Sequence, residues 1–104
     1  MRNHSRKASE ELECWMTHCH NVCREHGATG PSRFERMRKD YLTLRAMEML
    51  VEWPDIQSGL TWCWENNLLK YSVEAAVVKF AHEFDPKTLE CAKRRLRQYG
   101  HPVV

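Results

Sequence analysis

The sequence lacks the features that mark membrane proteins, common enzyme classes and phosphate-binding loops. None of its apolar runs approaches the roughly 18 residues that a bilayer-spanning helix requires. Its four glycines form no phosphate loop, and there is no G-x-S-x-G nucleophile motif. No segment alternates apolar and polar residues over any length, so no sheet is predicted. We therefore expect an all-α protein that is not an enzyme, holds no cofactor and binds no membrane.

The five cysteines include no C-x-x-C pair, the spacing that most structural zinc sites use. The weak candidates for metal ligands are Cys14, His18, Cys19, Cys23 and His26. Cys14/His18 and Cys19/Cys23 are each four residues apart, but the two pairs lie roughly 140° apart around a helix. We therefore expect no bound metal, and we interpret Cys19 and Cys23 as small core residues.

Length and composition suit one domain. The chain has 104 residues, of which 42% are hydrophobic and 29% are charged. We predict a flexible basic arm at 1–8, a single helical domain at 9–100 and a tail at 101–104. The basic start is followed by no apolar stretch, so we predict no secretory signal and expect an intracellular protein with reduced thiols.

Apolar periodicity and capping residues predict a compact bundle of about five helices. Ser9 precedes an acidic first turn, Ser32 and Glu35 form a capping box, and Ser72 can cap a later helix. Asp85 followed by proline predicts an abrupt start to the last helix. The predicted helices cover 9–26, 33–53, 54–66, 72–84 and 86–99.

We expect the helix at 33–53 to organise the fold. Phe34 begins a stripe of apolar residues that recur every three or four positions up to Val51. The first half of this segment is basic and should project into water. The second half is apolar nearly all round, so it should form the core or a subunit interface.

The strongest functional signal is the last helix, where four of the five residues 93–97 are Lys or Arg. Cations lie opposite an apolar face, as nucleic-acid binding needs, with Arg95 at the margin. The segment resembles the recognition helix of helix-turn-helix proteins, with 72–84 as the supporting helix and Phe84-Asp85-Pro86 in place of the usual glycine-containing turn. The candidate nucleic-acid-binding residues are Lys87, Lys93, Arg94, Arg95, Arg97, Arg33, Arg36, Arg38 and Lys39.

The basic helix also has other interpretations. A basic face opposite an apolar one is common on an ordinary solvated helix, especially near its C-terminus. The same run at 93–97 matches a nuclear-import signal, which would place the protein in the nucleus if its host has one.

A second surface is predicted from aromatic residues. Tryptophans cluster around the segment 54–66, and apolar residues also lie off the main stripes. This pattern is typical of a contact surface and predicts a homodimer or another protein partner. The candidate interface residues are Leu42, Met49, Trp53, Trp62 and Trp64.

The sequence therefore leaves three functions open. The first is a small intracellular nucleic-acid-binding protein. The second is a helical protein–protein interaction module, such as a viral or host-directed accessory factor, acting through the Trp-rich surface. The third is a zinc-dependent helical domain.

Overall fold

The computed structural model describes residues 6–29, 32–56 and 58–103, and within these ranges it contains helices and no strand. This confirms the predicted all-α class. The α-helices are α1 (Glu10–Glu25), α2 (Arg33–Asp40), α3 (Thr43–Val51), α4 (Ser58–Glu65), α5 (Val73–Lys79) and α6 (Pro86–Gln98). Two 3₁₀ turns, η1 (Leu69–Tyr71) and η2 (Ala81–Glu83), flank α5. No helix in the described ranges combines the length and apolar character needed to cross a bilayer.

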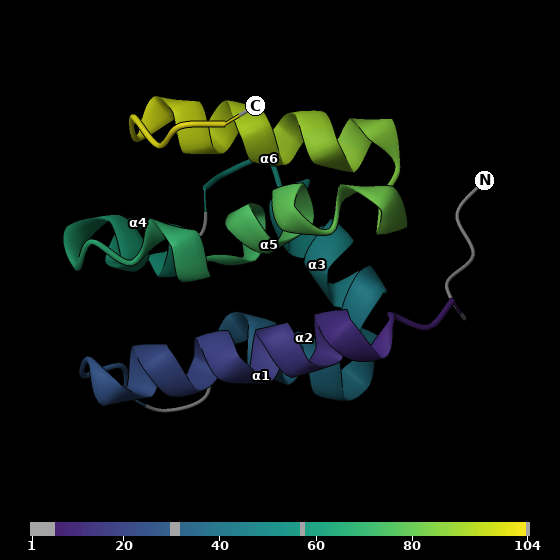
Figure 1. Cartoon of the computed structure of the whole chain (residues 1–104), viewed down its shortest axis with the longest axis horizontal. Coiled ribbons are helices and arrows are strands. Elements are labelled where there is room, and N and C mark those ends of the chain that lie inside the picture. Colours follow the sequence, from purple (N-terminus) through teal and green to yellow (C-terminus); the bar gives the residue numbers. More distant parts are fainter. Residues whose placement is uncertain (1–5, 30–31, 57, 104) are drawn as a thin grey trace.

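The helices form layers (Figure 1). In that view α1 and α2 lie at the bottom, α6 lies at the top, and α4 and α5 lie between them. Helix α3 contacts α2, α5 and α6, and α5 also packs against α1. Helices α1 and α2 run antiparallel, because Glu13 contacts Arg38 whereas His20 contacts Glu35.

The core is built mainly from α3 and its neighbours. Seven of the nine residues of α3 are buried. The side chains of Leu12, Met47, Val51 and Val77 are fully buried and belong to one hydrophobic cluster that joins α1, α3 and α5. This confirms that the second half of the predicted 33–53 segment forms core.

Three predicted helix caps are present. The hydroxyls of Ser9, Ser32 and Ser72 each accept a backbone N–H three residues on, at 3.1 Å. The capping box is complete, since the backbone N–H of Ser32 donates to Glu35 Oε1 at 3.0 Å. Asp85 occupies the N-cap position of α6, but its side chain makes no capping hydrogen bond.

The prediction of one helix over 33–53 is wrong. Tyr41 and Leu42 have extended backbones, with ψ of 166° and 158°, so the segment divides into α2 and α3. A contact with α1 stabilises the break: Arg38 Nε donates to Thr43 Oγ1 at 3.0 Å, and the Thr43 hydroxyl donates to Glu13 Oε1 at 2.7 Å. The change of direction also lets α2 bury Phe34, so the first half does not simply project into water.

Two other predicted helices are shorter than expected. Residues 54–56 are not helical, and the helix predicted from Pro54 begins at Ser58. The segment 72–84 ends its α-helix at Lys79, and Phe80 is only partly buried before η2. Their boundaries shift because proline and short 3₁₀ turns redirect the chain there.

The described part of the predicted basic arm is attached to the domain. Arg6 donates to the carbonyl of Glu83, the Ser9 N–H donates to Glu83 Oε1 at 2.8 Å, and Ala8 packs against the core. Residues 1–5 of the arm and residue 104 of the tail lie outside the described residues. Arg6 and Ala8 thus contact the domain, and the flexibility of the arm stays a prediction.

Candidate interaction groove

The basic face of α6 is largely exposed. Lys87, Arg94 and Arg97 are exposed and Lys93 is partly exposed. Lys87 Nζ lies 3.7 Å from Glu52 Oε1 on a side chain that is 74% exposed, so this ion pair is weak. In the described part of the chain, Lys93, Arg94 and Arg97 form no ion pair, which leaves three cations for an outside partner.

Arg95 does not belong to this face, and its assignment as a nucleic-acid contact is wrong. It is only 5% exposed. Its guanidinium donates to the carbonyl of Leu50 at 3.1 Å and to the carbonyl of Trp53. Its Nη1 atom also lies 3.8 Å from Glu74 Oε2. Arg95 therefore satisfies one carbonyl in the last turn of α3 and one just beyond the helix, and it cannot reach a phosphate.

The second basic stretch lies far from α6. Helix α2, which carries Arg33, Arg36, Arg38 and Lys39, lies in the bottom layer of Figure 1, whereas α6 lies at the top. Arg38 forms an ion pair with Glu13 on α1, in which Arg38 Nη2 lies 2.5 Å from Glu13 Oε1. The two stretches therefore do not combine into one basic face.

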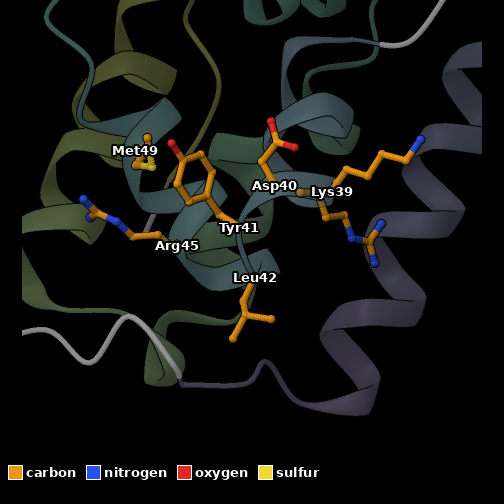
Figure 2. Close-up of a pocket in the computed structure, with 7 residues that line it drawn as sticks. Lys39, Asp40, Tyr41, Leu42, Arg45 and Met49 are labelled. Atoms are coloured by element: carbon orange, nitrogen blue, oxygen red, sulfur yellow. The ribbon is translucent and has the colours of Figure 1, made fainter.

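A shallow hollow of about 670 Å³ lies at the joint between α2 and α3. It contains Leu42 and Met49, together with Tyr41 and Lys39 (Figure 2). Figure 2 shows that Lys39 extends towards α1, whereas Tyr41 and Met49 lie on the other side of the joint and Leu42 points away from both. Because these side chains diverge, the hollow does not converge on a ligand.

The predicted Trp-rich interface is not one patch. Leu42 and Met49 line the hollow at the α2–α3 joint, which does not include Trp53. Trp62 lines a different depression, and Trp64 is exposed with its ring 5.2 Å from that of Tyr99 on the α6 side. The homodimer that this set was taken to indicate stays a prediction.

The most developed concave feature is a groove of about 760 Å³ between α1, α2 and α4, reaching the start of α5. Its volume lies in the range of ligand sites in proteins. Apolar side chains from four helices lie along it, and the rim is polar. The apolar lining residues are Met16, Phe34, Leu50, Leu60 and Trp62.

Charged groups of both signs border the groove. Arg24 and Arg33 are exposed on the α1 and α2 side, and Glu65 is exposed on α4. His20 Nδ1 lies 3.0 Å from Glu35 Oε1 across the α1–α2 contact, so this pair belongs to the scaffold. An apolar centre with a polar rim is the usual anatomy of a protein interface.

Gly59 leaves the backbone of α4 bare along the groove. It is the second residue of the helix and has no positive φ, and a Cβ placed on it would meet no atom within 4 Å. Neither backbone conformation nor internal packing therefore requires glycine at this position. The absence of a side chain leaves the α4 backbone accessible from the groove at this position.

Three thiols also line the groove, from Cys19, Cys23 and Cys63. Cys19 and Cys63 are buried, and Cys23 is partly exposed. Burial raises the pKa of Cys19 and of Cys63 to about 12, and it also raises the pKa of Cys23. These thiols are therefore protonated at neutral pH.

The metal-ligand candidates do not converge. Cys14 is exposed, the ring of His18 lies 5.5 Å from that of Trp15, and His26 Nδ1 lies 2.9 Å from the carbonyl oxygen of Val22. Among the described residues no set of three or more His, Cys, Asp or Glu side chains has a geometry that could hold a metal ion.

Trp62, Cys19 and Cys23 were singled out from the sequence, but nothing in the sequence indicated that they lie along one groove. The groove is formed by segments distant in the chain, and Cys63 and Gly59 become meaningful only beside α1. The one local signal was Gly59 itself, a helix-weakening residue in an otherwise apolar helix. No family model, curated protein or solved structure matches the chain.

Proposed function

We propose that this protein is a helical interaction module that binds an amphipathic helix of a partner protein in the groove between α1 and α4. The observation that carries the proposal is an apolar groove whose α4 wall is bare backbone at Gly59. Amphipathic helices bind in such grooves through apolar residues on one face. Because Gly59 has no side chain, the partner helix can approach the α4 backbone closely.

The charges on the rim specify the partner further. Arg24 and Arg33 favour acidic residues along one edge of the bound helix, and Glu65 favours a basic residue along the other. These flanking charges act as the e and g positions of a coiled coil do, by fixing orientation more than by adding affinity. Trp62 supplies the large aromatic anchor typical of binding hot spots.

The groove can be blocked without harming the fold. Gly59→Gln adds a side chain where there is open space and improves helix propensity by up to about 1 kcal/mol. Helical peptides selected from a displayed amphipathic library should bind the wild-type protein and should lose at least tenfold in affinity for Gly59→Gln, measured by fluorescence anisotropy. Trp62→Ala should lose about 30-fold, the loss expected from an interface hot spot.

Trp64→Ala is the matched control, because Trp64 lies on the same helix and does not line the groove. Its peptide affinity should equal that of the wild type, and thermal unfolding should show all three variants folded. Failure to select any binder, or binders that tolerate Gly59→Gln, would refute the groove as the binding site.

Nucleic-acid binding through α6 alone is a second candidate. It is favoured by the three cations Lys93, Arg94 and Arg97, which have no ion-pair partner among the described residues. Arg95 does not contribute to nucleic-acid binding because it is buried. The cations of α2 do not extend the α6 surface, because α2 lies in another layer. We therefore rank it below the interaction module.

The salt dependence of binding tests this second candidate. Replacing Lys93, Arg94 and Arg97 together by alanine should reduce the slope of log K against log salt by about 2.7 on duplex DNA, roughly 0.9 for each lost phosphate contact. The exposed Arg36 on α2 provides the control, since Arg36→Ala should leave the slope unchanged. No binding by wild-type protein at low salt, or an unaltered slope in the triple variant, would rule this function out.

A further inference from the structure

A buried carboxylate oxygen without a hydrogen-bond partner borders the groove. Glu74, in the first turn of α5, is 2% exposed, and it lines the groove where the groove reaches α5. Its Oε2 atom is buried and makes no hydrogen bond to any described residue. Leaving a buried acceptor without a donor is costly, and more so when the acceptor is charged. The folded protein therefore keeps at the groove an acceptor that a bound donor would satisfy.

The nearby arginine does not supply the missing hydrogen bond. Arg95 Nη1 lies 3.8 Å from Glu74 Oε2, which is beyond hydrogen-bonding distance. The same guanidinium donates to the carbonyl of Leu50 at 3.1 Å and to the carbonyl of Trp53, and these bonds fix its position. Arg95 is also absent from the lining of the groove. It therefore lowers the cost of a negative charge on Glu74 without satisfying the oxygen.

The less exposed hydroxyls that line the groove already have partners. The hydroxyl of Ser72 donates to the carbonyl of Leu69 at 2.7 Å. The hydroxyl oxygen of Thr61 lies 2.7 Å from that of Tyr99, within hydrogen-bonding distance. Among the described residues that line the groove, Glu74 alone has a buried side-chain oxygen or nitrogen with no hydrogen bond. A donor that enters the apolar centre of the groove would therefore find its acceptor at Glu74.

We propose that Glu74 binds the ammonium group of a lysine on the apolar face of the partner helix. This rests on the proposed function of the groove, and it adds a central basic residue to the charges that the rim favours. An ammonium has three donors and no acceptor, so it supplies both the hydrogen bond and the positive charge that Oε2 lacks. The lysine stem is apolar and packs along lining residues such as Met16 and Leu60.

Binding energetics favour this arrangement because half of its cost is met in the free protein. Glu74 is buried when the protein folds, so binding bears only the desolvation of the lysine. Access to the carboxylate needs small movements of the lining side chains, and rotamer changes of this kind are common when interfaces form. Met16 lines the groove and is unbranched, so it can adopt another rotamer.

A peptide pair tests the lysine. Helical peptides selected from the amphipathic library should carry a lysine within their apolar stripe. Replacing that lysine by norleucine, which keeps the stem and lacks the ammonium, should weaken binding to the wild-type protein roughly tenfold or more, the value of a charged hydrogen bond. Fluorescence anisotropy measures both affinities. The norleucine peptide should bind Glu74→Gln at least as well as the lysine peptide does.

Glu65→Gln is the matched control, because Glu65 is an exposed carboxylate on the rim of the same groove. It should keep the preference for lysine over norleucine. Selected peptides that lack a central lysine, or a lysine preference that survives in folded Glu74→Gln, would overturn the proposal. The comparison of the two peptides on wild-type protein holds even if Glu74→Gln does not fold, and a wild-type protein that shows no preference overturns the proposal by itself.

A small-molecule probe separates this inference from the proposed function. n-Hexylammonium, 1-hexanol and hexanoate share a stem and differ in their head groups. Titrated into wild-type protein and followed by NMR, n-hexylammonium should bind severalfold more tightly than 1-hexanol, and hexanoate should bind most weakly. Peptide binding without this order would overturn the role of Glu74 and leave the groove as the helix site. This order without any peptide binding would establish Glu74 as a cation site and refute the partner helix.

Discussion

Replacing Arg95 by alanine should lower the free energy of unfolding by about 3–5 kcal/mol, the range for breaking a buried ion pair from one side. Arg95 is 5% exposed and Glu74 is 2% exposed. The substitution removes the guanidinium that lies beside the Glu74 carboxylate and leaves the carbonyls of Leu50 and Trp53 without this donor. Urea denaturation followed by circular dichroism measures the loss.

Arg94→Ala is the matched control, since Arg94 is the neighbouring, exposed arginine on the same helix. It should change stability by no more than about 0.5 kcal/mol. A loss below about 1 kcal/mol for Arg95→Ala would show that Arg95 is not a buried structural residue. For the same reason, no test of α6 as a binding surface should replace Arg95, because such a variant would be strongly destabilised.

The stability loss should also depend on pH. Burial raises the pKa of Glu74, and Arg95 opposes that rise. A carboxyl with a raised pKa in the folded protein favours folding when it is protonated, and this contribution is lost as the pH rises through the folded-state pKa. Without Arg95 the pKa of Glu74 should rise further, so the loss in Arg95→Ala should shrink as the solution is acidified.

The helical class was predictable because its signals are local. Ser9, Ser32 and Ser72 make their capping bonds to N–H groups only three residues away. The sequence therefore contains both partners of each interaction, within a single helical turn. Apolar periodicity likewise depends on helix geometry alone, and it correctly indicated which face of most helices is buried.

The break between α2 and α3 was not predictable because its cause is distant. Tyr41 and Leu42 continue the apolar pattern, and no proline or glycine interrupts it. The partner that fixes the break is Glu13 on α1, which accepts from both Arg38 and Thr43. Nothing in the local sequence distinguishes this threonine from one inside a continuous helix.

The candidate site also depends on contacts between segments that are distant in the sequence. Periodicity placed Arg95 at the margin of the basic face, but its burial depends on carbonyls of α3 and a carboxylate on α5. Trp62 was correctly singled out as an unusual residue, yet it was grouped with Trp64, which lies on the other side of α4. The groove forms where α1 and α4 pack together, and the sequence of neither helix alone determines that packing.

Replacing Met47 by alanine should lower the free energy of unfolding by about 2–5 kcal/mol, as other large-to-small changes in a core do. Met47 is 0% exposed, and it lies among the buried side chains that join α3 to α1 and α5. The cavity left behind cannot close easily, because Leu44 and Val51 on the same helix are also held in the core. Chemical denaturation of the purified variant gives the value.

Met49→Ala on the same helix is the control, and it also tests the predicted homodimer. Met49 is partly exposed at the α2–α3 joint, so its loss should be no more than about 1 kcal/mol in a monomer. In a dimer that buries Met49, the loss would be larger and would depend on protein concentration, because association stabilises the folded state by mass action. Equal, concentration-independent losses for Met47→Ala and Met49→Ala would contradict the placement of α3, since the two methionines point to opposite sides of a helix.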